Sequence, residues 1–266
     1  MQEKVGIIQY GLGPIGSAVA RHVVERPGLE LVGCVDIDAA KVGRDAGEVI
    51  GLDHPLGFAV DSNLAQVLER THAEVVIHTT SSYFDLFEDQ IVEILEAGLD
   101  IVSTAEELSF PWMSNAQQAA KIDAVAKRAG KTILGTGVNP GFLMDALPLF
   151  LTAISQRVDR IEVTRVINAS TRRGPFQVKI GSGLTVEAFN AKMAAGRMGH
   201  VGLPESVGMV FHTLGKSLAR YESEVEPVVA DHPTRTEHFE VQPGQVRGLK
   251  QVARAYTDEG EFMTLT

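Results

Sequence analysis

A glycine-rich turn near the N-terminus constrains the fold of this chain more than any other feature. Gly11, Gly13 and Gly16 directly follow the β-branched stretch at 5–10, and a helical pattern begins at Pro14. In such a turn the first glycine permits a tight bend, the second lets backbone approach a pyrophosphate, and the third allows the helix to pack closely on the strand. The helix N-terminus also offers free N–H groups to phosphate oxygens. The turn therefore predicts a Rossmann-type dinucleotide-binding domain. Its predicted cofactor contacts are Gly11, Leu12, Gly13, Pro14, Ile15 and Gly16.

An acidic residue stands where such a domain holds the adenosine ribose. Asp36 closes the next apolar stretch, twenty residues after Gly16. A carboxylate there accepts hydrogen bonds from the ribose hydroxyls of NAD and repels the 2′-phosphate of NADP. Asp36 and its neighbour Ile37 are therefore predicted cofactor contacts, and NAD is the expected cofactor. Lys41 and Arg44 follow closely, so use of NADP remains an alternative.

Strand and helix patterns alternate along residues 1–140. Short β-branched stretches that end in turn residues predict strands, and apolar residues at helical spacing predict helices between them. The predicted strands are residues 5–10, 29–35, 75–78, 101–103 and 132–134. The predicted helices are residues 14–24, 40–49, 64–70, 84–97 and 114–128, the last with Ser114 as its N-cap. Right-handed crossovers then give an α/β fold, with a doubly wound parallel sheet over residues 1–143.

After Pro148 the pattern changes to that of a different domain. Residues 160–169 alternate with a period of two, which predicts a strand with one wet face, as in an antiparallel sheet. The further predicted elements are helices at 186–195 and 204–220 and strands at 225–230, 239–241, 251–256 and 261–266. Residues 144–266 are therefore expected to form a second, α+β domain on a mostly antiparallel sheet, used for substrate binding and oligomerisation.

Three loops fall where the carboxyl ends of the parallel strands should meet, at residues 79–82, 103–107 and 135–141. Ligands of open α/β sheets bind beyond these strand ends, although hydroxyl-rich turns also occur in loops that bind nothing. Asn139 offers the donor and acceptor that a carboxamide needs, although an Asn-Pro-Gly turn also has a purely structural explanation. The predicted cofactor contacts in these loops are Thr79, Thr80, Ser81, Thr104, Asn139 and Pro140.

Glu106 and Glu107 are the candidates for the chemistry, because they directly follow a strand that should point at a nicotinamide. Desolvation in a closed pocket would raise the pKa of a carboxyl toward neutrality, which suits general acid–base catalysis. The alternative interpretation is that they are acids favoured by the dipole at a helix N-terminus.

Other motifs narrow the class of chemistry. His200 lies in a segment flanked by glycine and proline, where it could donate a hydrogen bond to a substrate or act as an acid. By contrast, His78, His212 and His232 have no supporting neighbours in the sequence. No His, Cys and Asp set has the spacing of metal ligands, so no metal is expected. The absence of a Gly-x-Ser-x-Gly elbow argues against a hydrolase.

Composition narrows the class of partner. The formal net charge is −10 and no cluster of Lys and Arg is present, which disfavours nucleic acid. No stretch approaches the ~18 apolar residues of a membrane span, so no membrane partner is expected. The N-terminus enters a strand directly, without a basic leader and a long apolar stretch, so a cytoplasmic protein is expected. The one cysteine, Cys34, lies in an apolar stretch and is expected to be a buried, inert thiol.

Five stretches carry a resemblance to a known family. They are QYGLGPIG (9–16), STAEEL (103–108), GVNPGFLMD (137–145), RRGPFQVKIGSGL (172–184) and GHVGLPES (199–206). In these stretches the chain resembles the 2,4-diaminopentanoate dehydrogenases and the native amine dehydrogenases, which share their architecture with dihydrodipicolinate reductase. The resemblance implies reversible, NAD(P)-dependent oxidative deamination of an amine to a ketone and ammonia.

The resemblance also implies roles for particular residues. A glutamate of the STAEEL stretch, Glu106 or Glu107, would lie beside the nicotinamide and handle ammonia or the iminium, with Glu106 favoured. Phe142, Phe176 and His200 would line the substrate pocket. By analogy the protein is expected to form a homodimer through the sheet of its second domain.

The chain departs from the family pattern in two ways. Family members continue beyond the position of Thr266, so the second domain is expected to be incomplete at its C-terminus. The His-His and Lys-x-Asp-x-Pro-Ser-Gly stretches of dihydrodipicolinate reductases are absent, which weakens that function. Two alternatives stay open: an amino-acid or dicarboxylate oxidoreductase of the same fold, with Arg172, Arg173 or Lys179 as its carboxylate clamp, and a non-catalytic NAD(P)-binding protein.

Overall fold

Five parallel strands form the sheet of the N-terminal half, in a computed structural model that describes residues 4–195 and 198–266. The chain divides into an N-terminal unit, Met1–Phe142, and a C-terminal unit, Leu143–Thr266. The strand order in the first unit is β2-β1-β3-β4-β5, and the predicted doubly wound sheet is confirmed. The strands are β1 (Val5–Tyr10), β2 (Leu29–Val35), β3 (Val75–His78), β4 (Asp100–Ser103) and β5 (Ile133–Gly135).

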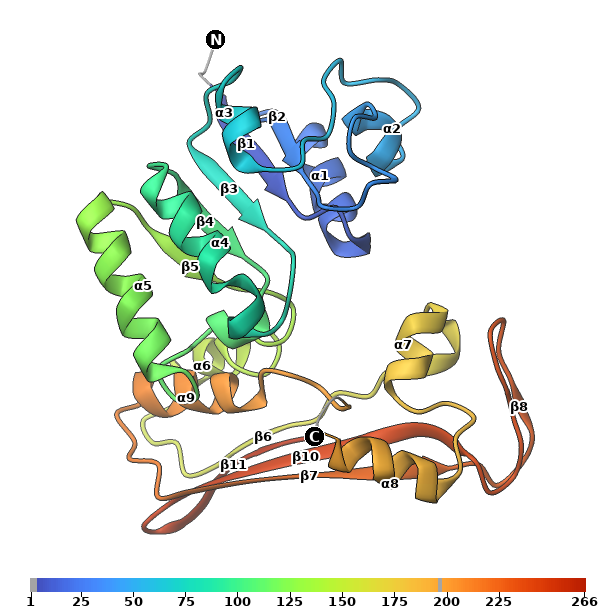
Figure 1. Cartoon of the computed structure of the whole chain (residues 1–266). Coiled ribbons are helices and arrows are strands. Elements are labelled where there is room, and N and C mark those ends of the chain that lie inside the picture. Colours follow the sequence, from blue (N-terminus) through green and yellow to red (C-terminus); the bar gives the residue numbers. More distant parts are fainter. Residues whose placement is uncertain (1–3, 196–197) are drawn as a thin grey trace. The chain divides into compact units, whose positions relative to one another are not determined.

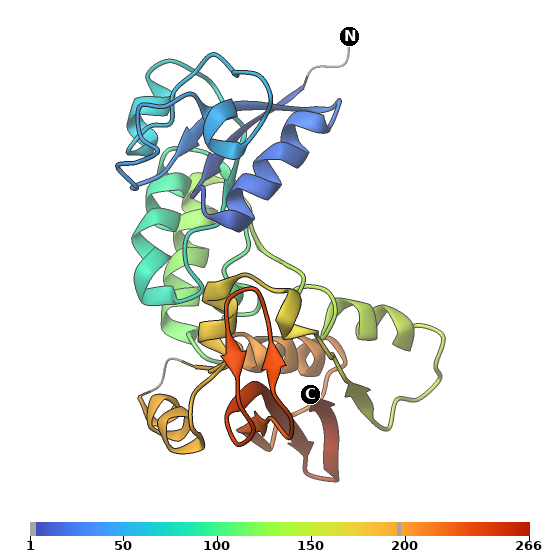
Figure 2. The same cartoon turned by 90° about the vertical axis from the view of Figure 1, so that its right-hand side faces the viewer.

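Helices cover both faces of this sheet, which explains why its strands are mostly apolar. Side chains alternate along β1, so that Ile8 and Tyr10 join a core cluster with α3, α4 and α5, whereas Ile7 joins a cluster with α1 and α2. In Figures 1 and 2, α4 and α5 run side by side. The helices are α1 (Pro14–Glu25), α2 (Ala46–Ile50), α3 (Leu64–Leu68), α4 (Phe84–Glu96), the 3-10 turn η1 (Glu106–Leu108) and α5 (Ala116–Ala129).

Two predictions about helix starts in this unit are wrong. The helix predicted at 40–49 begins only at Ala46, because the Asp45 side chain accepts a hydrogen bond from the Gly47 N–H at 2.8 Å and so starts α2 there. Ser114 does not cap α5: Asn115 holds the N-cap position, and no side chain makes the capping hydrogen bond.

The C-terminal unit is built on a four-stranded mixed sheet of order β6-β11-β10-β7. Its two longest strands pair antiparallel, and only β6 pairs parallel, with β11. The strands are β6 (Ile161–Val163), β7 (Arg220–Val229), β10 (Val246–Thr257) and β11 (Gly260–Leu265), and a separate ribbon pairs β8 (Thr234–Arg235) with β9 (Glu240–Val241). The predicted α+β domain on a mostly antiparallel sheet is confirmed.

Short helices accompany this second sheet. They are α6 (Ala146–Thr152), the 3-10 turn η2 (Ala169–Thr171), α7 (Gly174–Lys179), α8 (Val186–Ala194) and α9 (Leu203–Thr213). Helix α9 contacts β10, and Phe211 packs edge-on against Phe262 with ring centroids 5.4 Å apart. Helix α7 was not predicted, and α6 and α7 each hold a proline in their first turn, Pro148 and Pro175. Proline is tolerated in the first turn of a helix, where its missing N–H has no partner to lose.

Two predicted elements of this unit are shorter than expected. The strand predicted at 160–169 is confined to β6, because only residues 161–163 find ladder partners on β11. The helix predicted at 204–220 ends at Thr213, because Gly215 takes a left-handed conformation with φ +62° and the chain from Arg220 onward pairs with β10.

Two further sequence expectations concern single features. Cys34 is fully buried, so the expected burial of this thiol is confirmed, and burial raises its pKa to about 12. No helix within residues 4–195 and 198–266 is long and apolar enough to cross a membrane.

Candidate active site

The loops at the carboxyl edge of the N-terminal sheet are joined to one another by backbone hydrogen bonds. Gly11 donates to the Val35 carbonyl at 2.8 Å, and Thr79 donates to the Tyr10 carbonyl at 2.8 Å. Farther along the edge, Thr104 donates to His78 at 3.0 Å and Thr136 donates to Ser103 at 2.8 Å. The loops that carry the predicted cofactor residues are therefore brought together along one edge of the sheet, the usual ligand position in this fold.

The three glycines of the first turn have different surroundings. Gly11 adopts φ +91°, which disfavours any residue with a Cβ. A Cβ on Gly16 would lie 1.9 Å from the Gly11 carbonyl oxygen and 2.5 Å from the Thr79 hydroxyl, so α1 packs against the turn without space for a methyl group. A Cβ on Gly13 would meet no atom within 4 Å. Gly13 thus borders open space at the N-terminus of α1, which fits a pyrophosphate.

Asp36 is held in place at the end of β2. Its carboxylate accepts hydrogen bonds from the Leu12 N–H at 2.7 Å, the Asp38 N–H at 2.8 Å and the Lys41 ammonium at 3.0 Å. Burial alone would raise the pKa of this carboxyl, but these hydrogen bonds lower it below its usual value. The side chain is therefore an ionised, oriented acceptor next to the glycine turn, which fits a ribose diol. The neighbouring Ile37 and Ile15 side chains are exposed.

Thr79 and Thr80 make hydrogen bonds inside the protein. The Thr79 hydroxyl donates to the Gly11 carbonyl at 2.8 Å, and the fully buried Gln9 amide donates to the same carbonyl at 3.0 Å. These two side chains hold the glycine turn, and Gln9 was missed at the sequence level, although it is the one polar side chain inside an apolar strand. The Thr80 hydroxyl donates to Gln90 at 2.7 Å, and Ser81 accepts from the Tyr83 N–H at 3.2 Å.

The structure separates the two candidate glutamates. The Glu107 carboxylate accepts a hydrogen bond from the Phe84 N–H at 2.7 Å, so it sits at the N-terminus of α4. Burial raises the pKa of Glu107, and the negative charges of Asp85 and Glu106 raise it further. Glu106 is half-buried, and within the described parts of the chain no hydrogen bond or ion pair holds its carboxylate. The helix-dipole interpretation thus applies to Glu107, and Glu106 keeps a carboxylate available to a ligand.

His78 contradicts the expectation that it lacks supporting neighbours. The side chain is fully buried at the end of β3, and it makes hydrogen bonds to Ser103, Gln90 and Thr80 at 2.8–2.9 Å. The sequence hid these contacts because two of the three partners are 12 and 25 residues away.

The loop that follows β5 completes this edge. The Asn139–Pro140 peptide bond is cis, Asn139 is half-buried and Pro140 is buried. Gly141 adopts φ +113°, and a Cβ there would lie 2.3 Å from the Gly137 nitrogen. This close packing holds Asn139 at the carboxyl end of β5.

The residues that the resemblance placed in a substrate pocket come from separate segments. Phe142 closes the N-terminal unit with about half of its surface exposed, at 51%. Phe176 lies in α7 with the Arg172 guanidinium 5.9 Å from its ring centroid. The His200 backbone pairs with Gln251 through hydrogen bonds of 2.6 and 3.2 Å, just before α9.

The GVNPGFLMD and GHVGLPES stretches meet inside the C-terminal unit through side chains that were not predicted. Asp145 is fully buried, accepts from its own helix at the Ala146 N–H, and accepts the Ser206 hydroxyl at 2.7 Å. Gln177 is also buried and donates to the Arg172 carbonyl at 2.6 Å. Parts of the GVNPGFLMD, GHVGLPES and RRGPFQ stretches therefore have structural roles within this unit.

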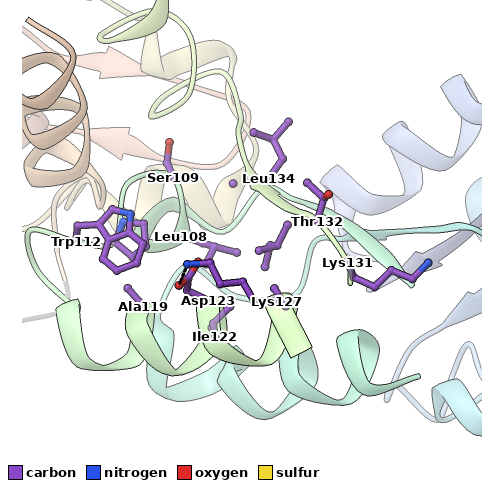
Figure 3. A pocket seen from close by; sticks show the side chains of 14 residues that line it. Leu108, Ser109, Trp112, Ala119, Ile122, Asp123, Lys127, Lys131, Thr132 and Leu134 are labelled. Atoms are coloured by element: carbon purple, nitrogen blue, oxygen red, sulfur yellow. Dashed lines mark hydrogen bonds and ion pairs between the residues drawn. The ribbon is translucent and has the colours of Figure 1, made fainter. Parts of the chain in front are cut away.

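A surface groove runs beside β5, the edge strand of the N-terminal sheet (Figure 3). Its lining is contributed by η1, α5 and β5, with Trp112 and Leu134 about half exposed. None of the predicted cofactor, catalytic or substrate residues lines this groove. The candidate site is therefore the carboxyl edge of the sheet, where the glycine turn, Asp36 and Glu106 lie, and not this groove.

Comparison with known proteins accounts for both units. Residues 4–133 match the family model of the dihydrodipicolinate reductase N-terminus, and residues 142–266 match that of the 2,4-diaminopentanoate dehydrogenase C-terminal domain. The chain is 26% identical to the solved amine dehydrogenase from Mycobacterium smegmatis, with a TM-score of 0.84, over 98% of this chain and 78% of that one. An amine dehydrogenase from Streptomyces virginiae is 27% identical over 66% of this chain and 49% of that protein.

One further relative is more similar in sequence and also matches almost the whole chain. The 2,4-diaminopentanoate dehydrogenase of Acetoanaerobium sticklandii is 33% identical over 268 residues, which cover 96% of this chain and 73% of that protein. Together with the matched C-terminal domain, this similarity establishes the resemblance that the five sequence stretches carried. The chain belongs to the 2,4-diaminopentanoate dehydrogenase family.

Proposed function

We propose that this protein is an NAD(P)-dependent amine dehydrogenase, which deaminates an amine to a ketone and ammonia and catalyses reductive amination in reverse. The family supports an oxidoreductase that acts on an amine. The observation that carries the proposal is the half-buried Glu106 carboxylate, which has no partner among the described residues and follows β4 at the cofactor edge of the sheet.

Glu106 is proposed to act on the nitrogen of the reaction, first in ammonium and then in the iminium cation. In the reductive direction it takes a proton from ammonium, and the ammonia lone pair then adds to the ketone carbon. Glu106 then returns this proton to the hydroxyl of the carbinolamine, which leaves as water and gives an iminium cation. The regenerated carboxylate stabilises this cation more than the neutral ketone. A nicotinamide cofactor held at the edge of the sheet would supply the hydride that this cation needs to become the amine. Glu107 keeps the loop attached to α4 through the Phe84 N–H.

The cofactor is proposed to lie along the edge of the sheet described above. The residues proposed to hold it are Gly11, Leu12, Gly13, Pro14, Ile15, Gly16, Asp36, Ile37, Thr79, Thr80, Ser81, Thr104, Asn139 and Pro140. Phe142, Phe176 and His200 are proposed to line the substrate pocket. Residues 1–143 are proposed to bind the cofactor, and residues 144–266 are proposed to bind the substrate.

NAD is the proposed preferred cofactor, and Asp36→Ser is expected to shift the preference toward NADPH by about tenfold or more. Asp36 repels a 2′-phosphate, and its removal also frees Lys41 to pair with that phosphate. Fluorescence titration gives the Kd values for NADH and for NADPH. The ratio of these values is unaffected by a loss of folded protein, because that loss affects both titrations equally. Asp38→Ser is the matched control, since it removes an exposed carboxylate 3.5 Å from the same ammonium. Equal weakening of both cofactors in Asp36→Ser would rule out this role.

A second candidate function is oxidation of an amino acid, and one observation favours it. Arg165 is half-buried, and burial together with the nearby Arg172 lowers the pKa of its guanidinium. No acid forms an ion pair with Arg165 or Arg172 within residues 4–195 and 198–266. Paired guanidinium groups of this kind suit a carboxylate. If this function holds, Arg172→Ala lowers the kcat/KM ratio of an amino acid over a plain amine of equal length, and an unchanged ratio contradicts it.

The enzyme is also proposed to act in the cytoplasm as a homodimer. Phe150 and Leu151 of α6, with the following Ile154, are apolar side chains that remain exposed, and a second copy of the chain would cover them. Sedimentation equilibrium at the mass of a single chain would contradict the dimer.

Absorbance of NADH with a panel of small ketones, with and without concentrated ammonium at alkaline pH, tests the proposed activity. Oxidation that strictly requires ammonium is the expected result. Oxidation without ammonium would indicate a carbonyl or imine reductase. Normal NADH binding with no oxidation on any ketone or amine would indicate a non-catalytic cofactor-binding protein.

A further inference from the structure

A buried imidazole joins the loops that follow β3 and β4 in the N-terminal unit. His78 and Ser103 are the last residues of these strands and lie opposite each other in the parallel register. The His78 Nδ1 atom lies 2.9 Å from the Ser103 hydroxyl, and Nε2 lies 2.9 Å from the Gln90 carbonyl oxygen of α4. Both side chains are fully buried, so neither can reach a substrate.

The hydrogen bonds fix where the protons are. The Ser103 oxygen accepts the Ala105 N–H at 3.1 Å, and its hydroxyl proton is donated to Nδ1, because the Gln90 oxygen on the other side of the ring can only accept and so requires the ring proton on Nε2. The Nε2 atom then carries the proton and donates it to Gln90. Burial lowers the pKa of His78, and the neutral ring matches this pattern. A protonated ring would place a donor on Nδ1 and leave the Ser103 hydroxyl proton without its acceptor.

Among the residues that the structure describes, the side chains that contact the His78 ring are all uncharged. The Tyr10 and Phe87 rings lie with their centroids 5.9 Å from the imidazole. Burial raises the pKa of Tyr10 to about 12, with a further contribution from Glu93 of α4, so the phenol stays neutral at working pH. Glu93 interacts with Tyr10, and Gln90, the contact from α4 itself, is uncharged.

This network ends next to the proposed catalytic carboxylate. Ala105 is buried and directly precedes Glu106, and its N–H is held by Ser103. The Thr104 N–H is held by the His78 carbonyl at 3.0 Å. Two consecutive peptide groups before Glu106 are thus fixed to His78, one through its backbone and one through its ring. The same ring contacts the Thr80 hydroxyl at 2.8 Å, in the neighbouring cofactor loop.

We propose that His78 and Ser103 are positioning residues, which hold the peptide before Glu106 so that its carboxylate meets the reacting nitrogen. The proposal rests on the proposed function for its effect on turnover, but not for its effect on the loop. A displacement of about 1 Å at a reacting group can cost on the order of a hundredfold in rate, so a buried network of this kind can control kcat without touching substrate.

Ser103→Ala tests the proposal, with Val76→Ala as the matched control. Val76 is a fully buried side chain of the same strand as His78, and its truncation removes core packing but no hydrogen bond. Ser103→Ala is expected to lower kcat for reductive amination by about tenfold to a hundredfold and to change the pH–rate profile, with NADH affinity near wild type. Val76→Ala is expected to lower Tm but to keep the wild-type kcat and pH–rate profile.

Substitutions at His78 give a second comparison. His78→Asn offers an oxygen that can accept the Ser103 hydroxyl in place of Nδ1, whereas His78→Leu keeps apolar volume without an acceptor. The asparagine variant is expected to retain the higher kcat. If His78→Leu is as active as His78→Asn, or if Ser103→Ala and Val76→Ala share one kcat and pH–rate profile, the network is only structural.

Hydrogen–deuterium exchange separates failure of this proposal from failure of the proposed function. Exchange of the Ala105 and Glu106 amides is measured in the wild type, in Ser103→Ala and in Val76→Ala. Faster exchange in Ser103→Ala than in the control supports positioning, even if the wild type shows no ammonium-dependent turnover. Equal exchange in both variants would overturn the proposal, whatever the enzyme's reaction.

Discussion

Glu106→Gln is expected to lower ammonium-dependent oxidation of NADH by about 10²–10³-fold while NADH binding stays near that of the wild type. The amide keeps the size of the side chain but replaces one acceptor oxygen by an NH2 donor and removes the negative charge. It can therefore neither take the proton from ammonium nor stabilise the iminium cation. Stopped-flow absorbance gives the rate, and fluorescence titration gives the Kd for NADH.

Glu107→Gln is the matched control for this substitution, since it removes the same charge one residue away. Its amide oxygen can still accept the Phe84 N–H, but without the charge that favours the N-terminus of α4. Burial and the negative charges of Asp85 and Glu106 disfavour the ionised form of Glu107, so the expected result is a free energy of unfolding within about 1 kcal/mol of the wild type and a smaller fall in kcat than for Glu106→Gln. A large loss of activity in Glu107→Gln alone would show that Glu107, and not Glu106, is the reacting carboxylate. Wild-type rates in both variants would show that neither carboxylate takes part in the reaction.

Alanine at Gly16 and alanine at Gly13 are expected to differ in their effect on stability. A Cβ at Gly16 would overlap the Gly11 carbonyl oxygen at 1.9 Å, so α1 must move away from the turn. Gly16→Ala is therefore expected to lose about 2–4 kcal/mol of unfolding free energy, together with NADH binding. Gly13 borders open space and has φ −63°, so Gly13→Ala is expected to fold with a loss of about 1 kcal/mol or less.

The effect of Gly13→Ala is expected in binding instead. Its methyl group would occupy the space through which the pyrophosphate approaches the helix, and a cost of about 1.4 kcal/mol or more corresponds to a tenfold or larger rise in the Kd for NADH. Urea denaturation gives the stability and fluorescence titration gives the affinity. Wild-type affinity in Gly13→Ala would place the cofactor elsewhere, and wild-type stability in Gly16→Ala would contradict the close packing of the turn.

The sequence predicted the N-terminal sheet well because its local signals agree with the tertiary structure. The strands Val5–Tyr10, Leu29–Val35 and Val75–His78 coincide with apolar stretches that end in turn residues. Such buried strands need no information from elsewhere in the chain.

Prediction failed where a distant partner decides the structure. The alternation at 160–169 predicts which side chains lie on one face of a strand. A strand also needs backbone hydrogen bonds to a neighbouring strand, and β11 pairs only with residues 161–163. The helix predicted at 204–220 overlaps the first residue of β7. This strand pairs with β10, which places Arg220 opposite Tyr256.

The candidate site shows the same limit. Local spacing could identify Glu106 and Glu107 as a pair, but the Phe84 N–H that distinguishes them lies 23 residues from Glu107. His78 looked isolated because its partner Ser103 lies on the next strand. A pattern in the sequence can thus place a residue at the edge of the sheet, but the division between reacting and supporting side chains depends on tertiary contacts.

The most direct test of the proposed reaction follows the ammonium nitrogen and the transferred hydrogen into the product. The enzyme is incubated with a ketone, ¹⁵N-ammonium and NADH carrying deuterium at the transferable C4 position, and the product is analysed by mass spectrometry. The proposed function predicts an amine that contains ¹⁵N and has one deuterium on the carbon bearing the nitrogen. An alcohol that carries deuterium but no ¹⁵N would contradict it and identify a carbonyl reductase.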